Sequence, residues 1–113
     1  MTALSHRFQL DDLQVDLGQQ LVTRDGTPLQ LPKLSFDMLV ALAKAAPNLV
    51  SIDELMSEVW PGLIVNPETV AQRIKLLRDA LGDDPRTPRY IESLRSRGYR
   101  LLPSVRTRPS ATA

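Results

Sequence analysis

The sequence has no cysteine and only one histidine, and both scarcities exclude classes of function. Without cysteine there is no disulfide framework, thiolate zinc site or cysteine nucleophile. The single imidazole, on His6, is too little for a histidine-rich metal site or a Ser–His–Asp triad. No apolar run approaches the roughly 18 residues of a membrane helix, and the N-terminus lacks a secretion-signal pattern. We therefore expect a cytoplasmic, non-enzymatic domain without metal or cofactor.

Charge is small in total but unevenly distributed. The 113 residues carry a net charge of +1, and 42% hydrophobic residues are typical of one globular domain. Residues 1–65 hold four basic residues against eight acidic ones, whereas residues 66–113 hold ten against five. Nine of those ten are arginines, whose planar guanidinium suits phosphate oxygens and guanine edges. This uneven distribution of charge favours a polyanionic partner on one side of the fold. The alternative is a basic face that is only solvated.

Short stretches of alternating apolar and polar residues at the N-terminus predict an antiparallel β-meander over residues 1–31. The expected strands are 8–10, 13–17, 21–23 and 28–31, separated by Asp-rich and Gly-containing turns. Such a small sheet is marginal alone, so one face needs cover.

Three helices are expected over residues 35–82, each with recognisable start or stop signals. Ser35 can cap a buried first helix that runs to about residue 46. Ser51 and Glu54 form the pattern of a capping box at the start of the second. Asn66 followed by Pro67 begins the third. The third helix should end at a glycine, Gly82.

The end of the chain predicts a β-hairpin within residues 89–103, with strands at 90–94 and 99–102. The domain is expected to span residues 1–104, and residues 105–113, small and polar, read as a flexible tail or linker. Two helices joined by a short connection and followed by an arginine-tipped hairpin form an α+β winged helix-turn-helix.

The third helix has two chemically different faces. At about 100° per residue, one arc is apolar and belongs to the core: Val70, Ile74, Leu77 and Leu81. The opposite arc carries groups that can read base edges in a major groove: Glu68, Gln72, Lys75, Leu76 and Asp79, flanked by Thr69, Arg73 and Arg78. An ordinary amphipathic surface helix is the alternative.

The hairpin carries Arg95 and Arg97 at its turn and Arg100 on its returning strand. Two guanidiniums on a narrow tip suit a minor groove, whose negative potential is strongest over A·T-rich sequence. The alternative is that these charges prevent edge-to-edge aggregation.

From residue 31 to 102 the chain resembles the DNA-binding domain of OmpR/PhoB-type bacterial transcription regulators, and the expected N-terminal meander also fits. Five segments carry the resemblance: residues 34–36 with 39–42, residues 50–55, residues 58–60, residues 69–81 and residues 97–101. Together these motifs are specific, although each alone is weak.

The resemblance implies that double-stranded DNA is the partner. It assigns the major groove to six residues of the third helix: Glu68, Thr69, Gln72, Arg73, Lys75 and Leu76. It assigns Arg78 and Trp60 to phosphate, with a core role for Trp60 compatible. It assigns the wing to Ser93, Arg95 and Arg97, with Tyr99 on the returning strand. The segment 61–65 matches one that touches RNA polymerase in some members, and Leu76 and Glu68 stand where some relatives have basic residues.

The receiver domain common in this family is absent from the sequence, an arrangement similar to the ToxR/CadC-like branch. The final residues read as the start of a linker, so we expect a fragment of a longer protein in which a membrane helix or sensor region follows; the domain would then face the cytoplasm. A stand-alone regulator is the alternative. We expect a monomer or weak dimer that pairs on tandem DNA half-sites. A winged-helix protein-interaction module is the competing function, which the basic charge disfavours.

Overall fold

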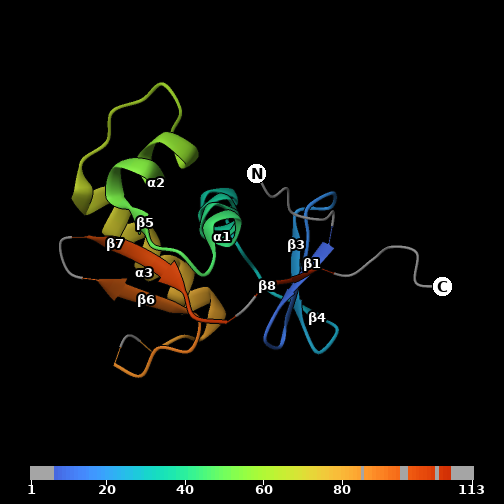
Figure 1. The fold of residues 1–113 in the computed structure, drawn as a ribbon. Coiled ribbons are helices and arrows are strands. Elements are labelled where there is room, and N and C mark those ends of the chain that lie inside the picture. The colour runs from blue at the N-terminus through green and yellow to red at the C-terminus, as the bar shows by residue number, and fades with distance from the viewer. Residues whose placement is uncertain (1–6, 85, 95–96, 104, 108–113) are drawn as a thin grey trace.

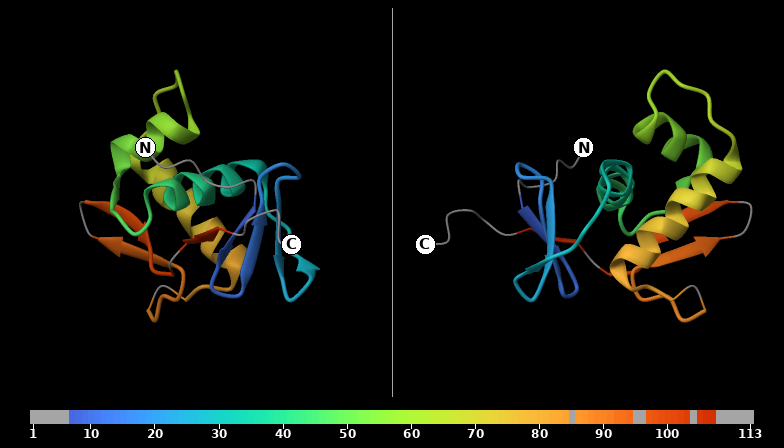
Figure 2. Two further views of the ribbon diagram at one scale, coloured as in Figure 1. Left: turned by 45° about the vertical axis from the view of Figure 1, so that its right-hand side comes forward. Right: turned by 180° about the vertical axis from the view of Figure 1, so that it is seen from behind.

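The computed structural model describes residues 7–84, 86–94, 97–103 and 105–107. Helix α1 lies in the middle, with an N-terminal sheet on one side and the remaining helices and a second sheet on the other (Figures 1 and 2). The buried apolar side chains of all these elements form one core cluster. Within the described residues, no helix is long and apolar enough to span a bilayer.

The N-terminal sheet is antiparallel, in the order β4-β3-β2-β1-β8. Its first four strands are β1 (Arg7–Leu10), β2 (Leu13–Asp16), β3 (Leu21–Arg24) and β4 (Thr27–Pro28). Alternate side chains of β1 and β2 are buried, as the sequence pattern predicted, so the meander is confirmed. The expected strand 28–31 is wrong in its bounds, because after Leu29 the chain leaves the sheet to begin α1.

Strand β8 (Val105–Thr107) corrects the expected start of the tail. It pairs antiparallel with β1, with Phe8 opposite Thr107 and Leu10 opposite Val105. The alternation signal within three residues is too short to predict a strand, and the partner lies at the other end of the chain. Residues 108–113 of the expected tail lie outside the described residues.

Helix α1 (Lys33–Ala45) begins two residues before the expected cap. Pro32 occupies the cap position and makes no side-chain cap bond, whereas Ser35 is fully buried inside the first turn. Proline suits this position because its missing N–H would be unpaired anyway. The expectation that Ser35 caps the helix is therefore wrong, while the burial of α1 is confirmed by seven buried side chains.

Helices α2 (Ile52–Val59) and α3 (Pro67–Leu81) begin and end where the sequence predicts. Ser51 and Glu54 form the complete capping box of α2. The Asn66 side chain accepts a bond from the Thr69 amide at the start of α3, and Gly82 ends it at φ 73°.

The second sheet, ordered β5-β7-β6, contains the wing hairpin. Its strands are β5 (Val50–Ser51), β6 (Ile91–Leu94) and β7 (Gly98–Leu101). Gly98 is buried at φ 144°, and a β-carbon there would lie 2.0 Å from the Val50 carbonyl oxygen. Glycine therefore permits the close pairing of β7 with β5, a strand not expected from the sequence. The winged helix-turn-helix is confirmed.

Candidate nucleic-acid interface

Helix α3 presents one apolar buried face and one exposed face, as its sequence predicts. Val70, Ile74, Leu77 and Leu81 are buried, whereas five residues opposite them are exposed: Glu68, Gln72, Lys75, Leu76 and Asp79. Leu76 is 40% exposed, a substantial area for an aliphatic side chain on a charged surface. The flanking residues Thr69 and Arg73 are half-buried.

The exposed polar groups of α3 are left free by the fold. Among the described residues, the side chains of Glu68, Gln72, Arg73 and Lys75 have no hydrogen bond or ion pair with the protein. Thr69 differs, because its hydroxyl donates to Asn66 and contributes to the helix cap. This face therefore offers two carboxylates, an amide, two cations and an aliphatic group to a partner.

The wing adds a further free cation. Arg97 is exposed, and its backbone amide closes the turn by donating to the Leu94 carbonyl oxygen. Ser93 is exposed and lies directly opposite half-buried Tyr99 in the hairpin register. Arg95 lies outside the described residues. Arg100, by contrast, forms an ion pair with Glu92 on the neighbouring strand.

Arg78, in the last turn of α3, is held by contacts within the protein. Its side chain is only 12% exposed, and one terminal nitrogen donates to the Ile91 carbonyl oxygen at 3.0 Å. Its Nε lies 3.9 Å from a carboxylate oxygen of Asp83. The guanidinium is thus directed into the protein, toward the start of the wing, while the expected phosphate contact stays a prediction.

Asp83 is a residue whose importance the sequence reading missed. Its carboxylate is fully buried and accepts hydrogen bonds from the backbone amides of Arg89, Tyr90 and Ile91, at 2.7, 3.2 and 3.0 Å. The one available signal was its place directly after Gly82 at a helix end, where a second Asp follows and a simple turn is the ordinary interpretation. Asp83 instead fixes the segment that leads from α3 into β6.

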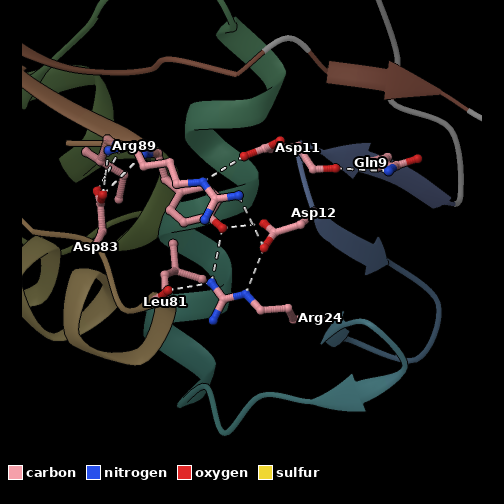
Figure 3. Close-up of polar contacts among 9 residues, drawn as sticks. Gln9, Asp11, Asp12, Arg24, Leu81, Asp83 and Arg89 are labelled. Atoms are coloured by element: carbon pink, nitrogen blue, oxygen red, sulfur yellow. Dashed lines mark hydrogen bonds and ion pairs between the residues drawn. The ribbon is translucent and has the colours of Figure 1, made fainter. Parts of the chain in front are cut away.

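A polar network joins the N-terminal sheet to the same region (Figure 3). Arg24 donates to Asp12, to the Leu81 carbonyl oxygen at 2.6 Å and to the Tyr90 hydroxyl. Tyr90 in turn donates to Asp12, and the guanidinium of Arg89 pairs with Asp11 at 2.8 Å. Since Leu81 is the last residue of α3, this network anchors the C-terminal end of that helix to the sheet.

The network also shifts the ionisation of its members. Burial raises the pKa of Tyr90, and its hydrogen bond to Asp12 raises it further. Burial opposes ionisation of Asp12, but the Tyr90 hydrogen bond and the charges of Arg89 and Arg24 outweigh it and hold the pKa of that carboxyl below its usual value. The hydrogen bond with Tyr90 raises the pKa of Arg24.

Trp60 and the segment after it lie at the end of α2. Trp60 is only 8% exposed, which agrees with the core role and leaves little of its surface for a ligand. In the segment 61–65, Leu63 and Ile64 are 65% and 101% exposed, the highest values among the large hydrophobic residues described. The described residues hold no group of three or more potential metal ligands.

The comparisons with known proteins agree with this geometry. The family model described as "Transcriptional regulatory protein, C terminal" matches residues 26–101. The transcriptional activator CadC of Escherichia coli is 37% identical over 99 residues, which cover 80% of this chain; the chain spans only 19% of CadC.

Two solved structures are similar in fold. The DNA-binding domain of E. coli CadC superimposes with a TM-score of 0.80 at 31% identity, covering 94% of this chain and all of that one. The DNA-binding domain of Klebsiella pneumoniae RstA, in complex with the RstA box, has a TM-score of 0.80 at 27% identity and covers 88% of this chain and 99% of that one. The family match over most of the sequence, together with this fold, shows that the chain belongs to the OmpR/PhoB-type family of transcriptional regulatory domains.

Proposed function

We propose that the chain binds double-stranded DNA sequence-specifically to regulate transcription, with α3 in the major groove and the wing in the minor groove. The observation that carries this proposal is the set of unpaired side chains on α3. The cations described between residues 7 and 65 all lie in ion pairs, whereas Arg73 and Lys75 on α3 are free beside uncharged and acidic base-reading groups. Free cations attract phosphate, and mixed polar and apolar groups read base edges.

The exposed row of α3 suggests which base groups are read. Glu68, Gln72 and Leu76 follow one another at intervals of four residues, so they lie about 6 Å apart along one side of the helix. A carboxylate accepts from the cytosine amino group, an amide pairs with adenine and an aliphatic group contacts the thymine methyl. Thr69, Arg73 and Lys75 flank this row, while the wing residues Ser93, Arg95, Arg97 and Tyr99 contact the neighbouring minor groove or its phosphates.

Further partners belong to the same proposal. The exposed Leu63 and Ile64 offer an apolar contact of the kind that RNA polymerase would supply, since exposed apolar pairs on a polar surface mark protein contacts. The free domain is a monomer or weak dimer that pairs on tandem half-sites. It acts in the cytoplasm, on the cytoplasmic side of the membrane if the full-length protein is anchored. A protein-interaction module fits less well, because interface cores are depleted in charge.

The test is fluorescence anisotropy on duplex DNA across several salt concentrations, using a preferred site selected from a random library. Gln72→Ala and Leu76→Ala should each cost about 1–3 kcal/mol on the preferred site and leave non-specific binding nearly unchanged. Matched controls are Gln14→Ala, an exposed glutamine of the N-terminal sheet, and Leu49→Ala, which is 37% exposed against 40% for Leu76. Absence of salt-dependent duplex binding by the folded wild type would favour the interaction module instead.

A further inference from the structure

Asp83 holds the first part of the wing through its buried carboxylate. The three backbone amides that donate to it belong to consecutive residues, 89 to 91, and the last of these is the first residue of β6. A carboxylate with several backbone donors is a strong local organiser, because each charge-assisted bond is about twice as strong as a neutral one. The start of β6 is therefore fixed to the chain at residue 83.

Arg78 completes the link from the helix side. It lies in the last turn of α3 and donates to the Ile91 carbonyl oxygen, so Ile91 is bonded through its amide to Asp83 and through its carbonyl to Arg78. The Arg78 carbonyl oxygen also accepts from the Asp83 amide at 2.8 Å. The buried Nε of Arg78 has no hydrogen-bond partner within the described residues, and it lies 3.9 Å from Asp83.

This arrangement joins the two DNA-facing parts of the molecule, α3 and the wing, through one pair of opposite charges. Removing either member leaves the other charge buried without its counterion, which is costly. One terminal nitrogen of Arg78 is therefore committed to the wing, and only 12% of the side chain is exposed.

We propose that Arg78 and Asp83 are positioning residues that set the orientation of the wing relative to α3, and thereby control how the wing engages DNA. The proposal rests on the function proposed above, in which both α3 and the wing contact one duplex. It differs from the role implied by the family resemblance, in which Arg78 itself contacts phosphate.

The two roles predict opposite effects for Asp83→Asn. If Arg78 acted on phosphate, removing its negative neighbour would leave binding unchanged or strengthen it. If Arg78 and Asp83 position the wing, Asp83→Asn places an amide group where the Ile91 amide needs an acceptor. The affinity for DNA should then fall at least fivefold, and the preference for A·T-rich over G·C-rich flanks should decrease. Sequence preference within the site read by α3 should remain. Arg78→Lys keeps the charge for a phosphate but cannot reproduce the guanidinium geometry, so it should behave like Asp83→Asn.

The wing orientation is measured separately in the free protein, from residual dipolar couplings of the amides in α3, β6 and β7. In Asp83→Asn and Arg78→Lys, we expect the angle between α3 and the hairpin to change, or the motion of the hairpin relative to α3 to increase and reduce its couplings. Arg24→Met is the control, because it removes polar bonds between the N-terminal sheet and α3 without touching the Arg78–Asp83 pair. It should lower stability while keeping the wing angle and the flank preference.

The outcomes separate the two proposals. Wild-type protein that does not bind duplex DNA refutes the proposed function, and the dipolar couplings still report on the positioning pair. If the wild type binds duplex DNA but both variants keep its dipolar couplings and its affinity, the positioning role alone is overturned. If Asp83→Asn fails to fold, Arg78→Lys carries the same comparison.

Discussion

Each of the four cations between residues 7 and 65 lies in an ion pair. The pairs are Arg7 with Asp16, Arg24 with Asp12, Lys33 with Asp37 and Lys44 with Glu58. Beyond residue 66, seven cationic side chains lie in the described part of the chain, and only Arg78, Arg89 and Arg100 are paired. The unpaired ones are Arg73 and Lys75 on α3, Arg86 in the following segment and Arg97 on the wing.

This difference shows why net charge is a poor guide to function here. The paired cations neutralise nearby carboxylates and add little to the field outside the protein. The unpaired ones are concentrated on the elements expected to face DNA, where they can replace condensed counterions. Arg86, which the sequence reading did not single out as a site residue, belongs to this second group.

The largest expected effect comes from breaking a paired cation that is partly buried. Arg24 is 30% exposed and bonds to Asp12, Tyr90 and Leu81, so Arg24→Met should lower the free energy of unfolding by about 2 kcal/mol. Arg7→Met removes a pair in which Arg7 is 70% exposed, and should cost less than about 0.5 kcal/mol. Urea unfolding followed by circular dichroism measures both. Equal losses in the two variants would contradict the structural role of the Arg24 network.

A second experiment removes unpaired cations. Lys75→Ala combined with Arg97→Ala should lower the salt dependence of DNA binding by about two charges and weaken affinity on the order of tenfold or more, with stability unchanged. The control is Arg7→Ala combined with Lys33→Ala, two exposed but paired cations of the other half. If both double variants changed the salt slope equally, the division into paired and unpaired charges would have no functional meaning.

The smallest expected effect is a pH dependence of the Tyr90–Asp12 contact. Tyr90→Phe should cost about 1 kcal/mol at neutral pH through the lost hydrogen bonds. Because the folded-state pKa of Tyr90 is raised, its stabilisation is complete below pH 10.0 and is lost as pH rises through the raised value. The difference between wild type and Tyr90→Phe should therefore shrink above pH 10.0.

At acid pH the sign is reversed. Because the folded-state pKa of Asp12 is lowered, its stabilisation is present above 3.8 and is lost as pH falls through the lowered value. Asp12→Asn should abolish this loss of stability at acid pH. It should also reduce, without removing, the alkaline pH dependence, because burial and the Asp12 hydrogen bond both raise the pKa of Tyr90. Unfolding midpoints measured over the full pH range check the acid and the alkaline prediction. If the stability difference between wild type and Tyr90→Phe grew above pH 10.0, the assignment for Tyr90 would be wrong.

The sequence predicts those features that depend on local patterns. The capping box of Ser51 and Glu54, the start of α3 at Asn66 and its end at Gly82 are all set by residues within one helical turn of the boundary. The exposed and buried faces of α3 follow in the same way from helical periodicity. These elements also carry most of the candidate site.

Features that depend on distant contacts were missed or misassigned. Ser35 is a good cap in isolation, but burial of the α1 face places it inside the helix. Strands β5 and β8 exist only because β7 and β1 supply their partners. Arg78 illustrates the same limit at the site, since its periodic position on α3 is compatible with solvent and only the location of Ile91 shows that it points inward.

The pairing of β8 with β1 has a consequence for the order in which the chain folds during synthesis. Phe8 is made early, but its outer neighbour in the sheet, Thr107, is made 99 residues later. Until then one edge of β1 has free amides and carbonyls that a second nascent chain can pair with. Closing such a long loop is slow compared with forming the local hairpins. Strands β1 to β4 thus precede the other elements of this domain in synthesis, but their sheet is completed only after those elements have been made.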